Sequence, residues 1–278
     1  RNQWGQFATP PALALSILRF AAGLLPVHSS VRFLDPGLGT GSFFSALKSI
    51  LPRERIENAV GIELDPGFAN AARELWANEG LEVRTADFTR EKAPGTKFNL
   101  VVSNPPYVRH HHLESSEKER LKRDVADRLH LRISGLAGLY CYFLLLSDGW
   151  MEDDGIGVWL IPSEFMDVNY GVAVKRYLSE RVELLRIHRF CPSDAQFPDA
   201  LVSSVIAVFR KRRPSPGHKA EFSFGGPLLN PSALASVSLK SLRDTRKWTL
   251  LPSTLTRGKS QEEASLGNFF AIKRGLAT

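Results

Sequence analysis

The sequence predicts an α/β fold in which helices cover both faces of a doubly wound, mostly parallel sheet. Short apolar runs alternate with amphipathic, helix-forming stretches over much of the chain, and this alternation is typical of a parallel sheet. The last two apolar runs follow each other without a helix between them, which indicates an antiparallel closing pair. We therefore expect a seven-stranded sheet with one antiparallel closing strand.

The expected elements follow from apolar spacing and from helix-ending residues. Thr9 and Asp65 are candidate N-caps, and Gly80 is expected to end a helix. The expected strands span residues 30–35, 58–65, 81–88, 98–104, 155–162, 183–190 and 201–211. The expected helices span residues 10–25, 42–51, 67–80, 116–129, 136–154 and 170–182, the fifth of them running into a turn.

Composition narrows the class of protein. Hydrophobic residues make up 43% and charged residues 23% of the 278 residues, which excludes a disordered or collagen-like chain. The two cysteines, Cys141 and Cys191, sit in apolar surroundings, so we expect a reducing, cytoplasmic setting without disulfides. The longest apolar run, residues 139–146, is too short to cross a membrane. The formal charge of +7 is compatible with a polyanionic partner.

Two units are expected along the chain. Residues 1–213 carry the α/β pattern, whereas residues 212–219 have the Pro, Gly and basic composition of a linker. Residues 214–278 are therefore expected to hold this linker and the beginning of a further, truncated domain. The chain has no initiator Met and no signal peptide, so we expect it to be part of a longer protein.

A glycine-rich turn, "DPGLGTG" at 35–41, follows the first expected strand. Gly37, Gly39 and Gly41 let the backbone pass close to a ligand, although such a turn alone is weak evidence. Asp35 gives it more meaning, because an acid here repels a pyrophosphate but suits a ligand with an ammonium group. S-adenosylmethionine carries such a group on its amino-acid part.

Two further acids occupy the ends of the next strands. Glu63 lies where a ribose diol is bound in doubly wound folds, and Asp87 with Phe88 offers a carboxylate for an amine and a ring for an adenine face. Each of them alone could be structural. Three acids at the ends of three successive strands are harder to explain as structural residues, because carboxylates at these positions do not contribute to a hydrophobic core.

The sequence "SNPPY" (103–107) forms a rigid corner behind the fourth expected strand. Proline restricts the residue before it and lacks an N–H, so Asn104 and Pro105 are held extended and the Pro105 carbonyl can accept from outside. An amide oxygen and a carbonyl side by side can accept both hydrogens of an exocyclic NH2, which localises the nitrogen lone pair for attack on a sulfonium methyl. Tyr107 offers a ring for stacking, and a duplex base must be flipped out to reach such a pocket. The alternative is an ordinary Pro-rich turn, against which the three acids argue.

The run "HHH" at 110–112 could suggest a metal. Three adjacent His cannot all face one ion on a regular element, and no Cys or acid completes a site. A solvated loop is the better interpretation, and no metal is expected.

The ordered set "GQFATPP", "DPGLGTGSF", "GIELD", "TADF", "NPPY", "GLYCYF", "GIGVWLIP" and "FPDALVSSVIAVF" resembles the gamma class of N6-adenine DNA methyltransferases of type II restriction–modification systems. The resemblance implies a class I, Rossmann-like methyltransferase domain over residues 1–213. It extends to about Lys211, and "FFAIKRGLAT" resembles the entry to a target-recognition domain.

The resemblance also implies roles for single residues. In the cofactor site, Thr9 would lie near the methionine end, Asp35 and the glycines would contact the amino acid, Glu63 the ribose, and Asp87 and Phe88 the adenine. In the target site, Asn104, Pro105 and Tyr107 would hold the base, with Phe197 stacked on its other side.

The implied function is transfer of a methyl group from S-adenosylmethionine to the N6 amine of a flipped adenine in double-stranded DNA. The endonuclease of such a system would lie in the same full-length chain or in a partner. Methyltransferases acting on a protein glutamine amide or on ribosomal RNA share the upstream motifs, but the long tail and "QFPDA" favour the DNA enzyme. A non-catalytic binding subunit would have no use for Asn104, Asp35 and Glu63 together.

Overall fold

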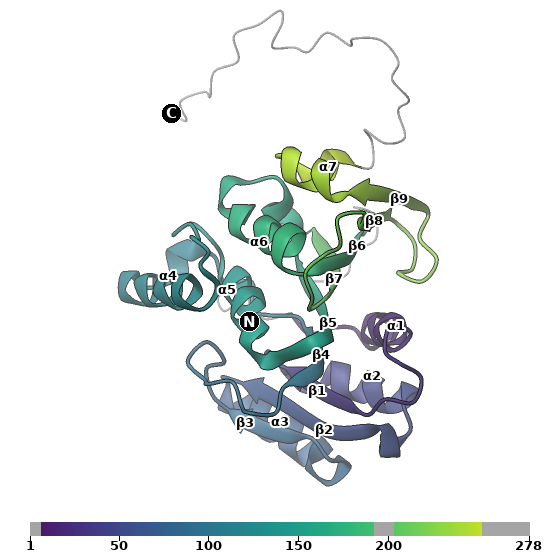
Figure 1. The fold of residues 1–278 in the computed structure, drawn as a ribbon. Helices are drawn as coiled ribbons and strands as arrows, with labels where there is room; N and C mark the ends of the chain where they lie inside the picture. Colours follow the sequence, from purple (N-terminus) through teal and green to yellow (C-terminus); the bar gives the residue numbers. More distant parts are fainter. Residues whose placement is uncertain (1–6, 192–202, 252–278) are drawn as a thin grey trace, which may run out of the picture.

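The computed structural model describes residues 7–191 and 203–251 and confirms the α/β class (Figure 1). Its strands form one mixed, mostly parallel sheet in the order β3-β2-β1-β4-β5-β7-β6-β8-β9. The parallel half, from β3 to β5, carries the predicted motifs at its carboxyl edge.

The elements have the following bounds. The strands are β1 (Val31–Asp35), β2 (Ile56–Glu63), β3 (Glu82–Thr85), β4 (Phe98–Ser103), β5 (Met151–Pro162), β6 (Glu183–Arg189), β7 (Ser204–Arg210), β8 (Lys219–Phe224) and β9 (Ala233–Ser238). The α-helices are α1 (Pro11–Ala22), α2 (Ser42–Ile50), α3 (Pro66–Trp76), α4 (Ser115–Leu129), α5 (Leu139–Leu146), α6 (Val172–Arg176) and α7 (Leu239–Asp244). Short 3-10 turns span Arg53–Arg55, Ala77–Glu79, His110–His112, Ser147–Trp150, Ser163–Met166, Asn169–Gly171 and Trp248–Leu250, and a π turn spans Tyr177–Arg181.

The closing pair is antiparallel as predicted. Strand β7 lies between β5 and β6 and pairs antiparallel with both. The number of strands was wrong, because β8 pairs parallel with β6 and β9 pairs antiparallel with β8, which gives nine strands among the described residues. Residues 212–278 were assigned to a linker and a further domain, and the sequences of these two strands, "KAEFSF" and "ALASVS", have no continuous run of large apolar residues.

The sheet continues across the domain boundary expected at residue 213. The residues interpreted as a linker form a short turn, in which the His218 N–H donates to the Ser215 carbonyl over 3.0 Å, and β8 begins at Lys219. A further domain stays a prediction, and its expected entry at residues 269–278 lies outside the described residues.

Helices cover both faces of the sheet, as a doubly wound fold requires (Figure 1). Along β4, Leu100 and Val102 pack with α1 and α2 on one face, whereas Val101 packs with α4, α5 and α6 on the other. This alternation follows from the two-residue period of a strand. Since both faces are covered, polar groups of β4 meet a ligand only where the strand ends.

Two expected helix caps have different outcomes. Asp65 caps α3, and its carboxylate accepts from the N–H groups of Gly67 (2.7 Å) and Phe68 (3.2 Å). Thr9 is not a cap, because α1 starts after Pro10 and has no side-chain cap; the Thr9 hydroxyl instead lies within the site described below. No helix among residues 7–191 and 203–251 has the length and apolar character needed to cross a membrane.

The segment after β9 returns along the edge of the sheet and is tied to it. Trp248 is fully buried, its ring lies 5.9 Å from that of Phe222, and its Nε1–H donates to the Leu242 carbonyl over 2.9 Å. The Thr249 hydroxyl lies 2.8 and 2.7 Å from the two carboxylate oxygens of Asp167, in the loop after β5. Residues up to 251 are therefore part of the same folded body.

We expect Trp248→Ala to lower the free energy of unfolding by about 3–5 kcal/mol, because it removes a large side chain that the core encloses. Urea unfolding followed by far-UV circular dichroism measures this change. The neighbouring Lys247 is exposed, so Lys247→Ala serves as the control and should leave the midpoint unchanged. Equal midpoints for both variants would mean that α7 and residue 248 do not stabilise the sheet.

Candidate active site

The polar residues predicted at strand ends lie along one edge of the sheet. Strands β3, β2, β1 and β4 are neighbours and run parallel, so their carboxyl ends meet at the same edge. Asp35 ends β1, Glu63 ends β2, Asn104 directly follows β4, and Asp87 lies two residues beyond β3. A ligand in a doubly wound fold binds at this edge.

Asp35 is almost completely buried, with 1% of its surface exposed. One carboxylate oxygen accepts from the Gly37 N–H and from the Ser103 hydroxyl, each over 3.0 Å. Burial raises the pKa of Asp35 from its usual 3.8 to about 7; the negative Glu63 adds to the increase, and the two hydrogen bonds oppose it. Ser103 was not predicted, and its only signal in the sequence is its place beside Asn104.

The raised pKa of Asp35 has a defined effect on stability. The folded protein keeps this proton up to about pH 7, whereas the unfolded chain releases it near pH 3.8. The resulting contribution to the free energy of unfolding is fully present below about pH 4 and is lost as the pH rises through about 7. An ionised Asp35 therefore gains from a cationic partner.

The glycine-rich turn is shaped by close approaches. A Cβ on Gly37 would lie 3.2 Å from the Ser103 hydroxyl and 3.4 Å from the Asn104 carbonyl, so this turn touches the corner after β4. Gly41 has φ of +90°, and a Cβ there would lie 2.6 Å from Nε1 of Trp76. A side chain at Gly37 would therefore press on the corner after β4, and one at Gly41 would collide with the Trp76 ring and strain the backbone.

Glu63 connects the turn to the end of β2. It is 7% exposed, and its two oxygens accept from the N–H groups of Gly39 and Asp65, each over 2.8 Å. The next residue, Leu64, is 65% exposed, which is unusual for a large apolar side chain beside a buried acid. Sequence reasoning missed it, although its place between two acids in "ELD" was a usable signal.

Asp87 and Phe88 follow the end of β3, and their side chains have different surroundings. One Asp87 oxygen accepts from the N–H (2.9 Å) and the hydroxyl (2.8 Å) of Thr89, and the other accepts from Arg90 (3.2 Å). Phe88 is 2% exposed, and its ring lies 5.2 Å from Phe143 and 5.3 Å from Trp150. The Phe88 ring therefore packs among other aromatic side chains of the core, and its expected contact with the adenine of the cofactor stays a prediction.

Asn104 is held by residues near the start of the chain. Its side-chain nitrogen donates to the Phe7 carbonyl over 2.9 Å and to the Thr9 hydroxyl over 3.2 Å. Its side-chain oxygen is buried and accepts no hydrogen bond from any residue between 7–191 and 203–251. A buried acceptor without a donor is costly, so this oxygen suits a donor that comes from a ligand.

Tyr107 lies beside Asn104 and its ring is fixed at both ends. The ring centroid is 5.4 Å from that of Phe7 and 6.4 Å from that of Tyr140. The Tyr107 hydroxyl donates to the Leu160 carbonyl over 3.1 Å, and burial raises the pKa of Tyr107 well above its usual value. The side chain is therefore a neutral, rigid surface.

The other expected site residues have mixed outcomes. Pro105 and Thr9 are buried next to Asn104. Phe197 lies outside the described residues. Residues His110–His112 form a single 3-10 turn, and the described part of the chain has no group of three or more side chains that could bind a metal.

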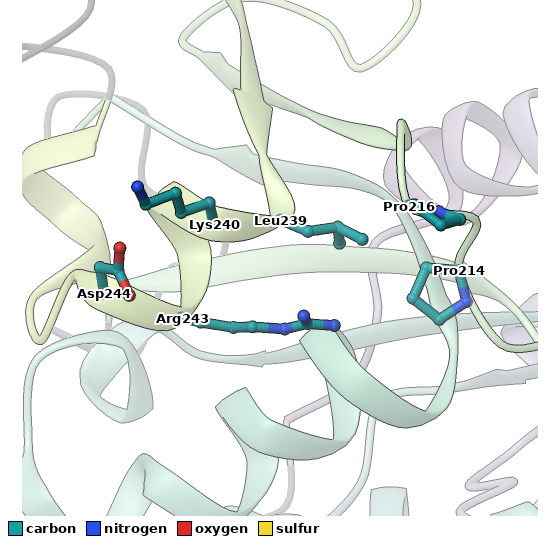
Figure 2. A pocket seen from close by; sticks show the side chains of 6 residues that line it. All are labelled: Pro214, Pro216, Leu239, Lys240, Arg243 and Asp244. Carbon is teal, nitrogen blue, oxygen red and sulfur yellow. The ribbon is translucent and has the colours of Figure 1, made fainter.

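The surface has two depressions, one beside the glycine-rich turn and one away from the predicted site residues. One, of about 350 Å³, adjoins the glycine turn and is lined by Thr40, Gly41 and Trp76 among others. The other, of about 400 Å³, lies between α7 and the turn before β8, and Figure 2 shows the Arg243 side chain pointing from α7 toward Pro214. Since β8 runs in the direction of β4, this second depression is at the amino edge of the sheet, opposite the predicted site.

Comparison with known proteins places this geometry in a family. The model of the Eco57I restriction-modification methylase family matches residues 48–197, just over half of the chain. The type II methyltransferase M.XamI of Xanthomonas campestris pv. amaranthicola is 27% identical over 99% of this chain and 52% of its own length. The release factor glutamine methyltransferase of Vibrio cholerae is 33% identical, but over only 46% of this chain and 48% of its own.

The fold has a close counterpart among solved structures. The type IIG restriction endonuclease BpuSI matches with a TM-score of 0.71 at 17% identity, over 91% of this chain and 33% of that one. The chain thus spans about half the length of the relatives, or less. With its mostly parallel sheet and the match over residues 48–197, the chain belongs to the Eco57I restriction-modification methylase family, a family of S-adenosyl-L-methionine-dependent methyltransferases.

Proposed function

We propose that this chain is the catalytic part of a DNA methyltransferase that methylates the N6 amine of a flipped adenine, as the modification activity of a restriction–modification system. One observation carries the proposal: the buried side-chain oxygen of Asn104 accepts no hydrogen bond from the described residues, while the side-chain nitrogen is already bonded. An exocyclic amine is the complementary group. The similarity to a type II methyltransferase along 99% of the chain supports DNA over a glutamine amide, for which the similarity covers 46%.

The residues at the edge of β1 and β2 fit S-adenosylmethionine. Asp35 is a buried carboxylate at a turn in which a Cβ on Gly37 would crowd the Ser103 hydroxyl, and its charge suits the ammonium group of an amino acid. Glu63 would accept from the ribose, since each of its oxygens has a second lone pair, and the exposed Leu64 offers an apolar surface for the adenine. Thr9 and Asp87 complete the proposed site.

The bound cofactor supplies a methyl group on a positively charged sulfur, and its transfer forms an N–C bond and breaks the C–S bond, whose electron pair stays on sulfur while the amine releases a proton. Asn104 and Pro105 prepare the amine for this step. Their two oxygens accept its two hydrogens, so the lone pair turns from the ring toward the methyl group. These contacts strengthen as the nitrogen becomes tetrahedral, which is when they lower the barrier.

Tyr107 holds the ring of the target base. Its neutral ring, which contacts Phe7 and Tyr140, would stack on the base, and Phe197 would stack on the opposite face of the base. A base within a duplex cannot enter this corner, so the enzyme must extrude it. The endonuclease of the system would lie elsewhere in the full-length chain or in a partner.

Binding of S-adenosylmethionine should weaken as the pH falls below about 7, because protonation of Asp35 removes the charge that faces the ammonium group. Between pH 8 and pH 6 we expect the dissociation constant to rise about tenfold in the wild type. Calorimetric titration measures it. Asp35→Asn should bind weakly with little dependence on pH, and a wild-type constant that does not change over this range would contradict the assignment of Asp35.

Asn104→Ala should lower the rate of methyl transfer about 10²–10³-fold, by analogy with loss of one transition-state hydrogen bond in a preorganised site. The dissociation constant of the cofactor should stay within about twofold. Single-turnover transfer of labelled methyl groups into DNA by the full-length protein measures the rate. Asn70 is exposed on α3, so Asn70→Ala is the matched control.

Analysis of the methylated nucleosides identifies the target. We expect N6-methyladenine, and N4-methylcytosine would keep the amine chemistry but overturn the adenine assignment. Methylation of a protein glutamine, with none in DNA, would overturn the proposed substrate altogether.

A further inference from the structure

We propose that residues 7–9 are a positioning segment, in which the Thr9 hydroxyl and the Phe7 carbonyl determine which end of the Asn104 amide faces the substrate. The inference rests on the proposed function, because it assumes that Asn104 accepts from an amine. It gives Thr9 a role separate from the cofactor contact that the resemblance implies.

The hydrogen bonds of the Asn104 amide are one-sided. Both bonds that the structure records for the side chain go from its nitrogen to the segment, at 2.9 Å to Phe7 and 3.2 Å to Thr9. The oxygen at the other end is buried and has no partner among the described residues. The amide is therefore oriented by residues about 95 positions away in the sequence and not by its own corner.

The Phe7 carbonyl sets the orientation because it can only accept. An amide rotated by 180° would place the Asn104 oxygen against this carbonyl, so two acceptors would face each other. It would also turn two N–H donors toward the hydrogens of the substrate amine. Thr9 takes the second hydrogen of the amide and thereby keeps the plane of the group fixed.

Residues 7–9 are held in place by the prolines and the helix that follow them. Thr9 is 8% exposed and precedes Pro10 and Pro11, and a proline holds the residue before it in an extended conformation. The following helix, α1, packs into the core through the fully buried Ile17 and Leu18. The Phe7 ring also lies against Tyr107, so the same three residues contact both the amide and the stacking ring.

A hydroxyl can accept and donate at the same time. The bond from Asn104 uses a lone pair of Thr9, and the hydroxyl hydrogen can still be donated to a ligand. A contact with the cofactor and the positioning of Asn104 are therefore compatible, and experiment can separate them.

Thr9→Val keeps the shape of the side chain but removes the acceptor. With saturating cofactor and DNA, we expect the single-turnover rate of the full-length protein to fall about 5–30-fold, the effect of leaving one buried donor unpaired. Because this rate is measured at saturating cofactor, the loss of a Thr9 contact with S-adenosylmethionine would appear in the dissociation constant and not in the rate. Thr9→Ser, which retains the hydroxyl, should restore most of the rate.

The matched control is Thr96→Val. Thr96 is exposed in the turn before β4, at the opposite edge of the sheet, so the transfer rate should not change. A loss in Thr9→Val that appears only in cofactor affinity would overturn the proposal, because Thr9 would then serve the cofactor alone. An unchanged rate with unchanged affinity would also overturn it.

A second measurement does not depend on activity. In the wild-type protein, both side-chain amide hydrogens of Asn104 should exchange slowly with solvent in NMR spectra, since both are bonded within the protein, and the resonances are assigned by their loss in Asn104→Asp. Fast exchange would overturn the proposal even if Thr9→Val failed to fold. If the wild type methylates no exocyclic amine but the exchange is slow, the proposed function fails while the positioning of the amide stands.

Discussion

A buried hydrogen-bond acceptor without a donor is the feature on which the arrangement around β4 depends. Among the described residues no donor reaches the Asn104 oxygen, while Phe7 and Thr9 accept from the nitrogen end of the amide. Such an atom lowers stability by about 1–3 kcal/mol. The surrounding core, in which β4 is covered on both faces, supplies the rigidity that keeps the amide from rotating to relieve it.

Asp35 shows the same principle with a charge. Its burial disfavours the ionised form, which is why its pKa reaches about 7. The Ser103 hydroxyl donates to Asp35, and Ser103 directly precedes Asn104 in the chain. The end of β4 therefore holds both the buried carboxylate and the buried amide oxygen in place. A single displacement of the end of β4 would alter both, which couples the proposed cofactor site to the proposed target site.

How far the sequence predicts this site follows from what each feature depends on. Asp35, Glu63 and Asn104 were placed correctly at one edge because a parallel sheet brings carboxyl ends together. The burial of the Phe88 ring was not predicted, because the direction of a side chain just past a strand depends on the path of the loop, which here turns the ring toward Trp150. The contact between Thr9 and Asn104 joins residues 95 positions apart and leaves no local pattern. Strands β8 and β9 were missed because neither has a continuous run of large apolar residues.

Strands β8 and β9 determine the path of the chain after the predicted sheet. Strand β9 and α7 lead from the amino edge, and the bond between Thr249 and Asp167 returns the chain to the loop after β5. Strand β5 is the parallel neighbour of β4, so this loop lies at the edge that holds Asn104. Lys175 is largely buried and donates to the Arg246 carbonyl over 2.6 Å. This bond is a second tie between residues 246–249 and the region that follows β5. The residues up to 251 therefore belong to the same folded body, and at Thr249 they reach the edge of the sheet that also holds Asn104.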